Sequence, residues 1–400
     1  MSSRWGKDLN AAAVWAGITA FVWYAFGAVP LHIAVSEQLG LSTAQTSSWI
    51  FIVWFSGAVA TIAASLHFRQ PIPITWTIPG LIYLGTLAGR FTFAELVGAN
   101  LVAGVLLLAL GLAGIGGRIM KWLPLPIIMG MFGGSILSYV LRMVTATVQD
   151  VAVAGTAVAC YLAGRFIANP RVPPVGLAVV GGGIAVGLVG TTGVQPIVWT
   201  LPEFAVPPMT FSLSTAIAVS LPMVVLAIGL GNVQGLGFLL GQGYKVPVNP
   251  VSTMVGLASI INAFFGGHPA TIARTGVAIL ASPDSGPASG RYWAAVISAA
   301  LTIALALAAT PVASLLNVLP KSYIYALAGL AILASLQDAL EKSFSGGLRF
   351  GALVGFIVGA TPFAVLGISS AFWAIIAGLV ASWLVERKQL VDFWRQENAG

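Results

Sequence analysis

The sequence predicts an all-α polytopic membrane protein with fourteen transmembrane segments, arranged as two inverted repeats of seven. Three observations predict this fold: the composition, the spacing of long apolar stretches, and a repeat at a fixed offset. Hydrophobic residues make up 58% of the 400 residues and charged residues only 7%, whereas about a quarter of the residues in soluble proteins are charged. A water-soluble domain cannot bury that much apolar surface, so we expect the chain to lie in a lipid bilayer.

The apolar stretches approach the roughly 20 residues that a helix needs to cross the hydrocarbon core. The first set of predicted spans covers residues 11–35, 43–66, 73–89, 94–114, 123–141, 151–168 and 173–190. A polar, proline-rich connector over residues 191–210 follows. The second set covers residues 213–240, 248–265, 269–282, 292–312, 320–337, 348–363 and 367–385.

The positions of the basic residues predict the orientation of the spans. With the N-terminus inside the cell, fourteen of the eighteen Lys and Arg residues fall on the cytoplasmic side. Arg90, Arg142 and Lys321 fall in outside loops, and Arg274 falls within a span. We therefore expect an integral protein of the bacterial inner (plasma) membrane with both termini in the cytoplasm. Because the basic residues are scattered singly, no nucleic-acid partner is expected.

A repeat with an offset of 196 residues relates the two halves of the chain. The matching pairs are Thr19 and Thr215, Ala20 and Ala216, Pro73 and Pro269, Thr75 and Thr271, Gly80 and Gly276, Leu84 and Leu280, Leu123 and Leu319, Pro124 and Pro320, Ile128 and Ile324, Gly133 and Gly329, Ile136 and Ile332, and Leu137 and Leu333. Seven spans is an odd number, so the halves must have opposite orientations, as in many secondary transporters. The predicted repeats are residues 1–200 and 201–400.

The third and tenth spans are unusual because each begins with prolines and residues that favour extended backbone. Residues 71–80 and 266–276 are each expected to enter the membrane as a short extended segment that becomes helical near the midplane. Non-helical backbone survives at that depth only where it is buried in protein or lines a cavity. Two broken spans at equivalent places in the two halves therefore mark the expected binding site.

The two half-helices are expected to aim their N-termini at one pocket and to favour an anion there. Helix N-termini carry unpaired backbone N–H groups and a partial positive charge. Arg274, at the start of the second half-helix, would add a full charge, and an ionisable residue inside a span is functional by default. The alternative is that Arg274 bonds backbone carbonyls or reaches an interface.

Hydroxyl, aromatic, amide and glycine residues near the half-helices complete the predicted substrate site. They are Thr75, Trp76, Thr77, Gly80, Asn232, Gln234, Thr271, Thr275, Gly276 and Tyr24. The threonines could donate to a carboxylate, or they could cap helices. The aromatic rings could stack on a substrate ring, or they could pack in the core. The amides lie in an otherwise apolar span and need polar partners.

Acidic and sulfur-containing residues offer few further candidates. All eleven acidic residues, Asp338 included, are placed in loops or at span ends, so no carboxylate is expected at the midplane. His268, just before the tenth span, is the candidate for proton coupling, with a structural hydrogen bond as the alternative. Cys160 is the only cysteine, so neither a disulfide nor a thiolate metal site is expected. We expect no metal or cofactor, and a membrane enzyme remains a remote alternative.

Four segments of the sequence resemble the benzoate transporter family BenE: residues 76–80 (WTIPG), 220–232, 243–250 (GYKVPVNP) and 367–373 (GISSAFW). The resemblance covers most of the chain and implies the inverted seven-plus-seven repeat of uracil permeases and sulfate permeases. It also implies a core domain of spans 1–4 and 8–11 and a gate domain of spans 5–7 and 12–14. The gate domain would form a homodimer interface. The activity it implies is uptake of an aromatic carboxylate such as benzoate, alongside protons, by alternating access.

The rival interpretation is a sulfate, bicarbonate or chloride exchanger or channel on the same scaffold. The stretch Ile272–Thr275 resembles the sulfate permeases, whose tenth span carries an arginine at this place. A typical benzoate carrier is expected to have a small residue there. The sequence ends soon after the fourteenth predicted span, without the soluble C-terminal domain that is common in sulfate permeases, which favours the benzoate group.

Overall fold

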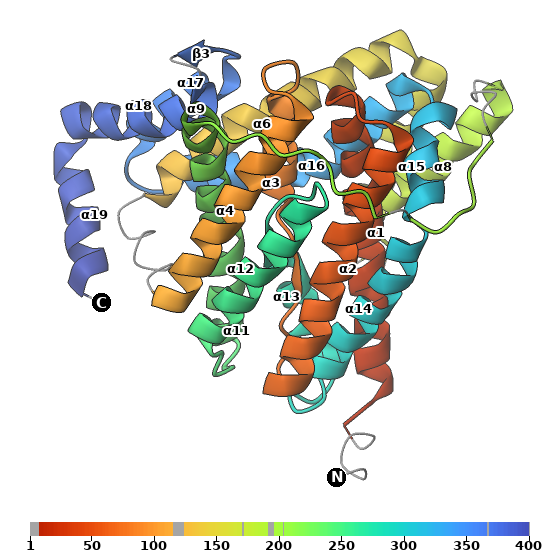
Figure 1. Cartoon of the computed structure of the whole chain (residues 1–400), viewed down its shortest axis with the longest axis horizontal. Coiled ribbons are helices and arrows are strands. Elements are labelled where there is room, and N and C mark those ends of the chain that lie inside the picture. Colours follow the sequence, from red (N-terminus) through yellow and green to blue (C-terminus); the bar gives the residue numbers. More distant parts are fainter. Residues whose placement is uncertain are drawn as a thin grey trace.

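A computed structural model describes residues 8–114, 124–169, 172–190, 196–202, 204–365 and 368–399, without the side chains of residues 396–399. Leu123 of the repeat, residues 191–195 of the connector and Gly367 lie outside the described residues. The described chain is mostly helical, and its long helices lie side by side (Figure 1). The prediction of a helical protein of the membrane type is therefore confirmed.

The helices of the first half begin close to the predicted spans. They are α1 (Ala11–Gln38), α2 (Thr43–Phe68), α3 (Ile78–Thr86), α4 (Phe93–Ala113), α6 (Leu125–Gln149), the π-helix η2 (Val151–Gly155), α7 (Thr156–Ile167) and α8 (Pro174–Val189), with strand β1 (Ile74–Trp76) before α3. Capping boxes start two of them: Ser42 with Gln45 starts α2, and Thr92 with Glu95 starts α4. Helix α6 runs eight residues past its predicted end at residue 141.

The second half is more interrupted. Its elements are α9 (Leu213–Thr215), η3 (Ala216–Ser220), α10 (Leu221–Val225), η4 (Leu226–Asn232), α11 (Val233–Gly241), α12 (Val248–Phe264), β2 (Ala270–Ile272), α13 (Arg274–Leu280), the 3₁₀ turn η5 (Pro283–Ser285), α14 (Tyr292–Leu307), α15 (Ala309–Val318), α16 (Lys321–Phe344), α17 (Arg349–Ala360), β3 (Ala364–Val365), β4 (Ile368–Ser369), α18 (Ser370–Val385) and α19 (Arg387–Ala399). The π-helices η3 and η4 lie within one continuous helical segment, and π-turns occur frequently at functional sites. Helix α16 also outruns its predicted end at residue 337.

Strands β1 and β2 form a two-stranded antiparallel sheet between the halves of the chain. Thr75 lies opposite Thr271, and these two residues are also equivalent in the 196-residue repeat. An antiparallel pair in which equivalent residues face each other is the arrangement that a local twofold axis produces. Pro71 and Pro73 prevent a continuous helix here, because proline lacks the N–H that a helix interior requires.

Element boundaries in the two halves follow the same offset. Strand β1 and strand β2 begin 196 residues apart, and so do α3 and α13, α6 and α16, and α8 and α18. The matching ends of α8 and α18 show that the repeat extends to the last long helix of each half.

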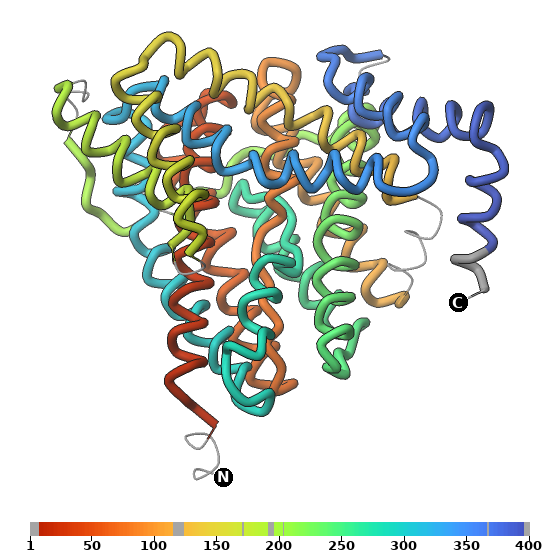
Figure 2. Tube along the Cα trace, turned by 180° about the vertical axis from the view of Figure 1, so that it is seen from behind, coloured from red at the N-terminus to blue at the C-terminus, as the bar shows by residue number. Residues whose placement is uncertain are grey.

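The helices form two packed groups. In one group, α4 packs on α12, and α14 packs on α1 and α2. In the other, α16 and α17 pack on α6, α18 packs on α17, and α7 packs on α8. Figure 2 shows α6 and α16 running beside each other across the molecule. Helix α1 also contacts α8 and α16 and thus joins the groups.

The described helices include six that are long and apolar enough to cross a membrane, or up to eight if each bent pair is one span. One bent pair is α14 with α15, at an angle of 56°, and the other is α18 with the start of α19, at 108°. Helices α7, α8, α12 and α17 are apolar but shorter. The chain is an integral membrane protein by these lengths and compositions.

Small residues bring α4 and α12 into close contact. A Cβ atom added at Gly111 of α4 would lie 2.8 Å from backbone atoms of Ser252 and Thr253, and one added at Gly256 of α12 would overlap the backbone of Leu108. Such contacts are typical of membrane helices, because small residues let two backbones approach.

Replacing Gly256 with alanine should destabilise the protein by about 1–3 kcal/mol, since the added methyl group forces α4 and α12 apart. The matched control is Gly187→Ala on α8, where a Cβ atom would meet nothing within 4 Å. That change should be neutral or slightly stabilising. Thermal unfolding in detergent, followed by tryptophan fluorescence, measures both, and equal melting temperatures would contradict the close packing.

Candidate functional site

A cavity of about 230 Å³ lies where β1, β2, α3 and α13 meet. Both strands line it, through Thr75 and Trp76 of β1 and Thr271 and Ile272 of β2. The first turns of α3 and α13 also line it, together with residues of α1, α6, η4 and α16. Both half-helices therefore start at the wall of one cavity, to which the two groups of helices contribute.

Polar side chains of neighbouring helices satisfy the outer edges of the sheet. The Thr61 hydroxyl of α2 accepts a hydrogen bond from the Ile74 N–H at 2.8 Å and donates one to the Ile74 carbonyl at 2.7 Å. On the other edge, the Asn232 side-chain oxygen accepts hydrogen bonds from the Ile272 N–H at 3.0 Å and the Thr271 hydroxyl at 3.1 Å. A short sheet inside a membrane protein needs such partners, since lipid offers none.

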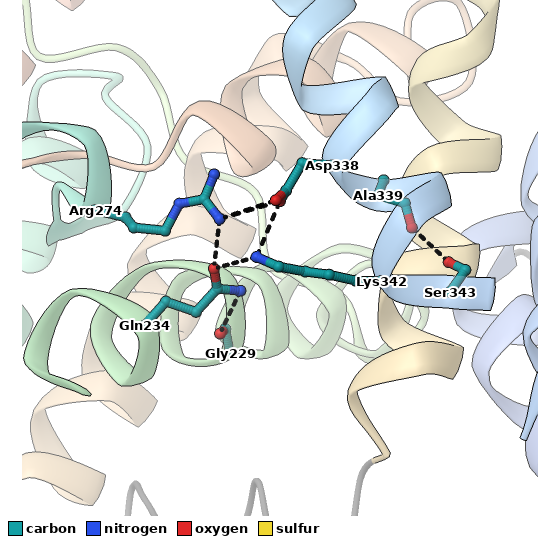
Figure 3. A network of polar contacts seen from close by, with 7 residues as sticks. All are labelled: Gly229, Gln234, Arg274, Asp338, Ala339, Lys342 and Ser343. Carbon is teal, nitrogen blue, oxygen red and sulfur yellow. Dashed lines mark hydrogen bonds and ion pairs between the residues drawn. The ribbon is translucent and has the colours of Figure 1, made fainter. Parts of the chain in front are cut away.

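An ion pair connects the two groups of helices across the cavity (Figure 3). One guanidinium nitrogen of Arg274, on α13, lies 3.1 Å from a carboxylate oxygen of Asp338, on α16. The ammonium of Lys342 lies 3.1 Å from the same oxygen. The side-chain oxygen of Gln234 accepts hydrogen bonds from Arg274 at 3.1 Å and Lys342 at 3.2 Å. Two cations thus share one carboxylate and one amide.

The ion pair is partly exposed to solvent. The Arg274 side chain is 38% exposed and that of Asp338 is 29% exposed. Because both residues line the cavity, an anion entering it would meet a guanidinium whose carboxylate partner is partly solvated. Partly exposed pairs of this kind are weak, with a typical value of about 0–1 kcal/mol.

The two half-helices present different chemistry at their starts. Thr77 caps α3 by accepting a hydrogen bond from the Gly80 N–H at 3.2 Å, and Pro79 has no N–H. Helix α13 begins after Ala273, which makes no side-chain capping bond, and its first residue is Arg274. The cationic end of the cavity is therefore at α13, where the first-turn N–H groups receive no cap from a side chain.

Aromatic rings form another part of the cavity wall. Trp76 is 4% exposed, stacks on Trp54 with ring centroids 5.1 Å apart, and meets the edge of Tyr24 at 6.3 Å. Trp23, Tyr24 and Phe132 line the cavity together with Trp76. One cavity thus combines a cation with a surface on which an aromatic ring can rest.

The structure brings most of the predicted substrate residues to this cavity. Those that line it are Tyr24, Thr75, Trp76, Gln234, Thr271, Arg274 and Thr275. Of the others, Thr77 caps α3 through the Gly80 N–H, and Asn232 turns towards β2. Gly276 lies directly beside the Tyr24 ring, which leaves no space for a side chain. Thr77, Gly80, Asn232 and Gly276 therefore lie behind the residues that line the cavity.

Asp338 was expected at the end of a span, just after residue 337, but α16 continues to Phe344 and Asp338 lines the cavity. Charge marks the end of most spans, but here Asp338 pairs with Lys342 one turn later and with Arg274 across the cavity, so α16 continues through both charges. The spacing of four residues between Asp338 and Lys342 is a signal from which the longer helix could have been predicted.

His268 does not line the cavity. It is fully buried, and its Nδ1 accepts a hydrogen bond of 3.0 Å from the indole N–H of Trp49. Among the described residues, no group of three or more His, Cys, Asp and Glu side chains is arranged to hold a metal ion. The chemistry that the cavity offers is binding and release of an anion with an apolar ring.

Comparison with known proteins shows that the chain belongs to a membrane transporter family. The family model described as benzoate membrane transport protein (BenE) matches residues 7–384. The inner membrane protein YdcO of Escherichia coli strain K12 is 30% identical over 345 residues, which cover 85% of this chain and 87% of that protein. The benzoate membrane transport protein of Acinetobacter baylyi is 25% identical over 383 residues, which cover 95% and 96% of the two chains.

Two solved structures have a similar fold. The transmembrane domain of the cyanobacterial bicarbonate transporter BicA matches with a TM-score of 0.60 at 17% identity, over 92% of this chain and 97% of that chain. The murine solute carrier 26 family member A9 anion transporter, in its inward-facing state, matches with a TM-score of 0.59 at 14% identity, over 96% and 69%. At these identities the likeness is one of fold.

Replacing Asn232 with alanine should destabilise the protein by about 1–3 kcal/mol, because the Ile272 N–H and the Thr271 hydroxyl lose a buried acceptor. The control is Asn317→Ala, since Asn317 is exposed and its bond to Thr43 is at the surface; it should change stability by less than about 0.5 kcal/mol. Thermal unfolding in detergent measures both, and a stable Asn232→Ala protein would refute the anchoring of β2.

Proposed function

The chain belongs to the benzoate membrane transport protein family, and we propose that it is a secondary active transporter that imports a small aromatic carboxylate such as benzoate together with protons. The observation that carries the proposal is one cavity that is lined both by Arg274 and by the Trp76 and Tyr24 rings. A benzoate-like solute has the same two features, a carboxylate at one end and an apolar ring at the other. The Acinetobacter baylyi relative is named as a benzoate membrane transport protein, which supports the same substrate class.

In the proposed complex the substrate carboxylate replaces Asp338 as the partner of Arg274. Arginine binds a carboxylate well because its planar fork can donate two parallel hydrogen bonds. Thr275, beside Arg274 on α13, adds a hydroxyl at the same end of the cavity. The ring then rests against Trp76 and Tyr24, where its apolar faces leave water.

We propose that the fourteen predicted spans cross the membrane as seven plus seven with opposite orientations. In this topology β1 with α3 and β2 with α13 are the two broken spans. The shared offset of the element boundaries and the pairing of Thr75 with Thr271 support this topology. In this topology both termini lie in the cytoplasm of a bacterial cell. The Escherichia coli relative is named as an inner membrane protein, which supports the inner membrane as the location.

Alternating access requires two bodies that move relative to each other. We assign the core to spans 1–4 and 8–11 and the gate to spans 5–7 and 12–14, in agreement with the two packed groups of helices. The Arg274–Asp338 pair then joins core to gate. Movement is of the rocking or elevator type, and the gate helices are the proposed homodimer interface.

An inorganic-anion exchanger or channel is the second candidate. Arg274 at the start of α13 suits any small anion, and the two solved relatives are named as a bicarbonate transporter and an anion transporter. The aromatic wall favours the carboxylate with a ring, because sulfate, bicarbonate and chloride gain nothing from an apolar surface. Competition decides: if chloride or sulfate competes for binding and benzoate does not, the aromatic substrate is wrong.

Purified protein in liposomes should accumulate labelled benzoate when an inward proton gradient is imposed, and should accumulate little without one.

Arg274→Ala should weaken benzoate binding about 30- to 150-fold, equivalent to about 2–3 kcal/mol for a charge-assisted hydrogen-bonded pair. The control is Arg349→Ala, since Arg349 is exposed and bonds only locally to Gly346. Unchanged affinity in a folded Arg274→Ala protein would remove Arg274 from the site.

Asp338→Asn should bind benzoate more tightly, by up to about fivefold, because the substrate no longer competes with a carboxylate for Arg274. Lys342 and Gln234 remain as neighbours of the vacated position. Isothermal titration calorimetry on detergent-purified protein measures the change. Weaker binding in Asp338→Asn would mean that Asp338 holds Arg274 in place for the substrate and does not compete with it.

A further inference from the structure

Two histidines from opposite halves of the chain meet behind the cavity. His32, on α1, and His268, just before β2, are both fully buried. Their ring centroids are 5.7 Å apart. The ring of His32 is also surrounded by three indoles, with centroid distances of 5.8 Å to Trp49, 5.7 Å to Trp54 and 5.8 Å to Trp76. The proposed substrate complex uses neither imidazole.

The hydrogen bonds of the two rings fix where their protons lie. The Trp49 indole only donates, so Nδ1 of His268, its acceptor at 3.0 Å, is bare and the ring proton is on Nε2. Nδ1 of His32 lies 3.0 Å from the Ala28 carbonyl, which only accepts, so the His32 proton is on Nδ1 and Nε2 is bare. Nε2 of His268 thus carries an N–H, and Nε2 of His32 carries a lone pair. Neither Nε2 atom has a hydrogen-bond partner among the described residues.

We propose that His32 and His268 together form a site for one proton, and that this proton travels with the substrate. A proton from water outside the cell binds the bare Nε2 of His32 without breaking the bond from Nδ1 to Ala28. The resulting imidazolium lies among three indole rings, each in T-shaped contact with it. A second proton is disfavoured, because it would place two positive rings side by side. On the cytoplasmic side the proton returns to water.

The position of the pair connects it to the substrate, and so the inference rests on the proposed function. Ala28 and Trp76 line the cavity, and His32 bonds the carbonyl of one and packs on the ring of the other. A negative carboxylate in the cavity therefore favours a proton on the pair, and by linkage the proton favours the carboxylate.

Other titratable groups near the pair belong to the cavity or its wall. Tyr24 lies two turns earlier on α1 and meets the edge of Trp76. Arg274 of α13 and Asp338 of α16 pair with each other in the cavity beyond that ring. The backbone of Thr77 also faces the His268 ring. Among the described residues, the ring of His32 contacts the three tryptophans and His268. Its bare Nε2 makes His32 the proton acceptor of the pair.

Asparagine variants separate the proton site from the structural bonds. In His32→Asn the amide N–H can still donate to the Ala28 carbonyl, and in His268→Asn the amide oxygen can still accept from Trp49; both variants lack Nε2. Each should keep saturable benzoate binding and counterflow, in which labelled and unlabelled benzoate exchange without a proton gradient. Each should lose accumulation driven by a proton gradient, and proton uptake should fall from about one per benzoate to near zero.

The control is His67→Gln, because His67 is the remaining one of the three histidines and is exposed at the end of α2. It should accumulate benzoate like the wild type. Accumulation that persists in both asparagine variants would overturn the two-histidine site and leave the carrier intact. A wild-type protein that neither binds nor exchanges benzoate would instead overturn the proposed function.

The tautomers of His32 and His268 can be measured independently of any transport assay. Nitrogen-15 NMR of histidine-labelled protein should assign the neutral proton to Nδ1 in His32 and to Nε2 in His268, with each signal identified by its absence in the matching asparagine variant. The same spectra should show His32 protonating first as the pH falls with benzoate bound. A first protonation at His268, or two rings of the same tautomer, would contradict the site.

Discussion

The structure depends on satisfying the backbone of a two-stranded sheet in a protein that lies in lipid. Strands β1 and β2 pair with each other along one edge only, and lipid supplies no hydrogen bonds for the other edges. Thr61 of α2 completes the edge of β1, and Ser65 bonds the backbone of Ile72 just before it. Asn232 and Ser259 complete the edge of β2. These bonds fix α2, η4 and α12 around the sheet, and the sheet in turn fixes where both half-helices begin.

The two halves share a backbone and differ in the chemistry they bring to the cavity. Equivalent positions hold Ile78 at the start of α3 and Arg274 at the start of α13, and equivalent caps are Thr77 and Ala273. One half-helix start is therefore neutral and capped by its own threonine, and the other is cationic and uncapped by a side chain. The internal repeat duplicates the backbone elements that surround the cavity. The residues that differ between the halves give the cavity both polar and aromatic lining.

The sequence predicts elements well where a pattern is local and less well where partners are distant. Prolines and β-favouring residues mark the two extended segments, and the 196-residue offset relates the element boundaries of both halves. Asp338 was misplaced because a charge near the end of an apolar stretch looks like the end of a span. Only the fold shows that its partner is Arg274, 64 residues away in sequence. The meeting of His32 with His268 is likewise a product of the tertiary fold.

In the proposed transport cycle, the ion pair between Arg274 and Asp338 acts on the empty carrier. If the proposed core moves past the proposed gate, α13 and α16 separate and the pair breaks, so Arg274 loses its carboxylate partner. Because both side chains are partly exposed, this loss is small, about 0–1 kcal/mol. A bound carboxylate would supply the counter-charge and move with the core, so we expect the loaded core to cross more easily than the empty one. Because a ligand shifts a conformational equilibrium only through its differential affinity, exchange of one carboxylate for the other on Arg274 is the step that we propose ties movement to substrate.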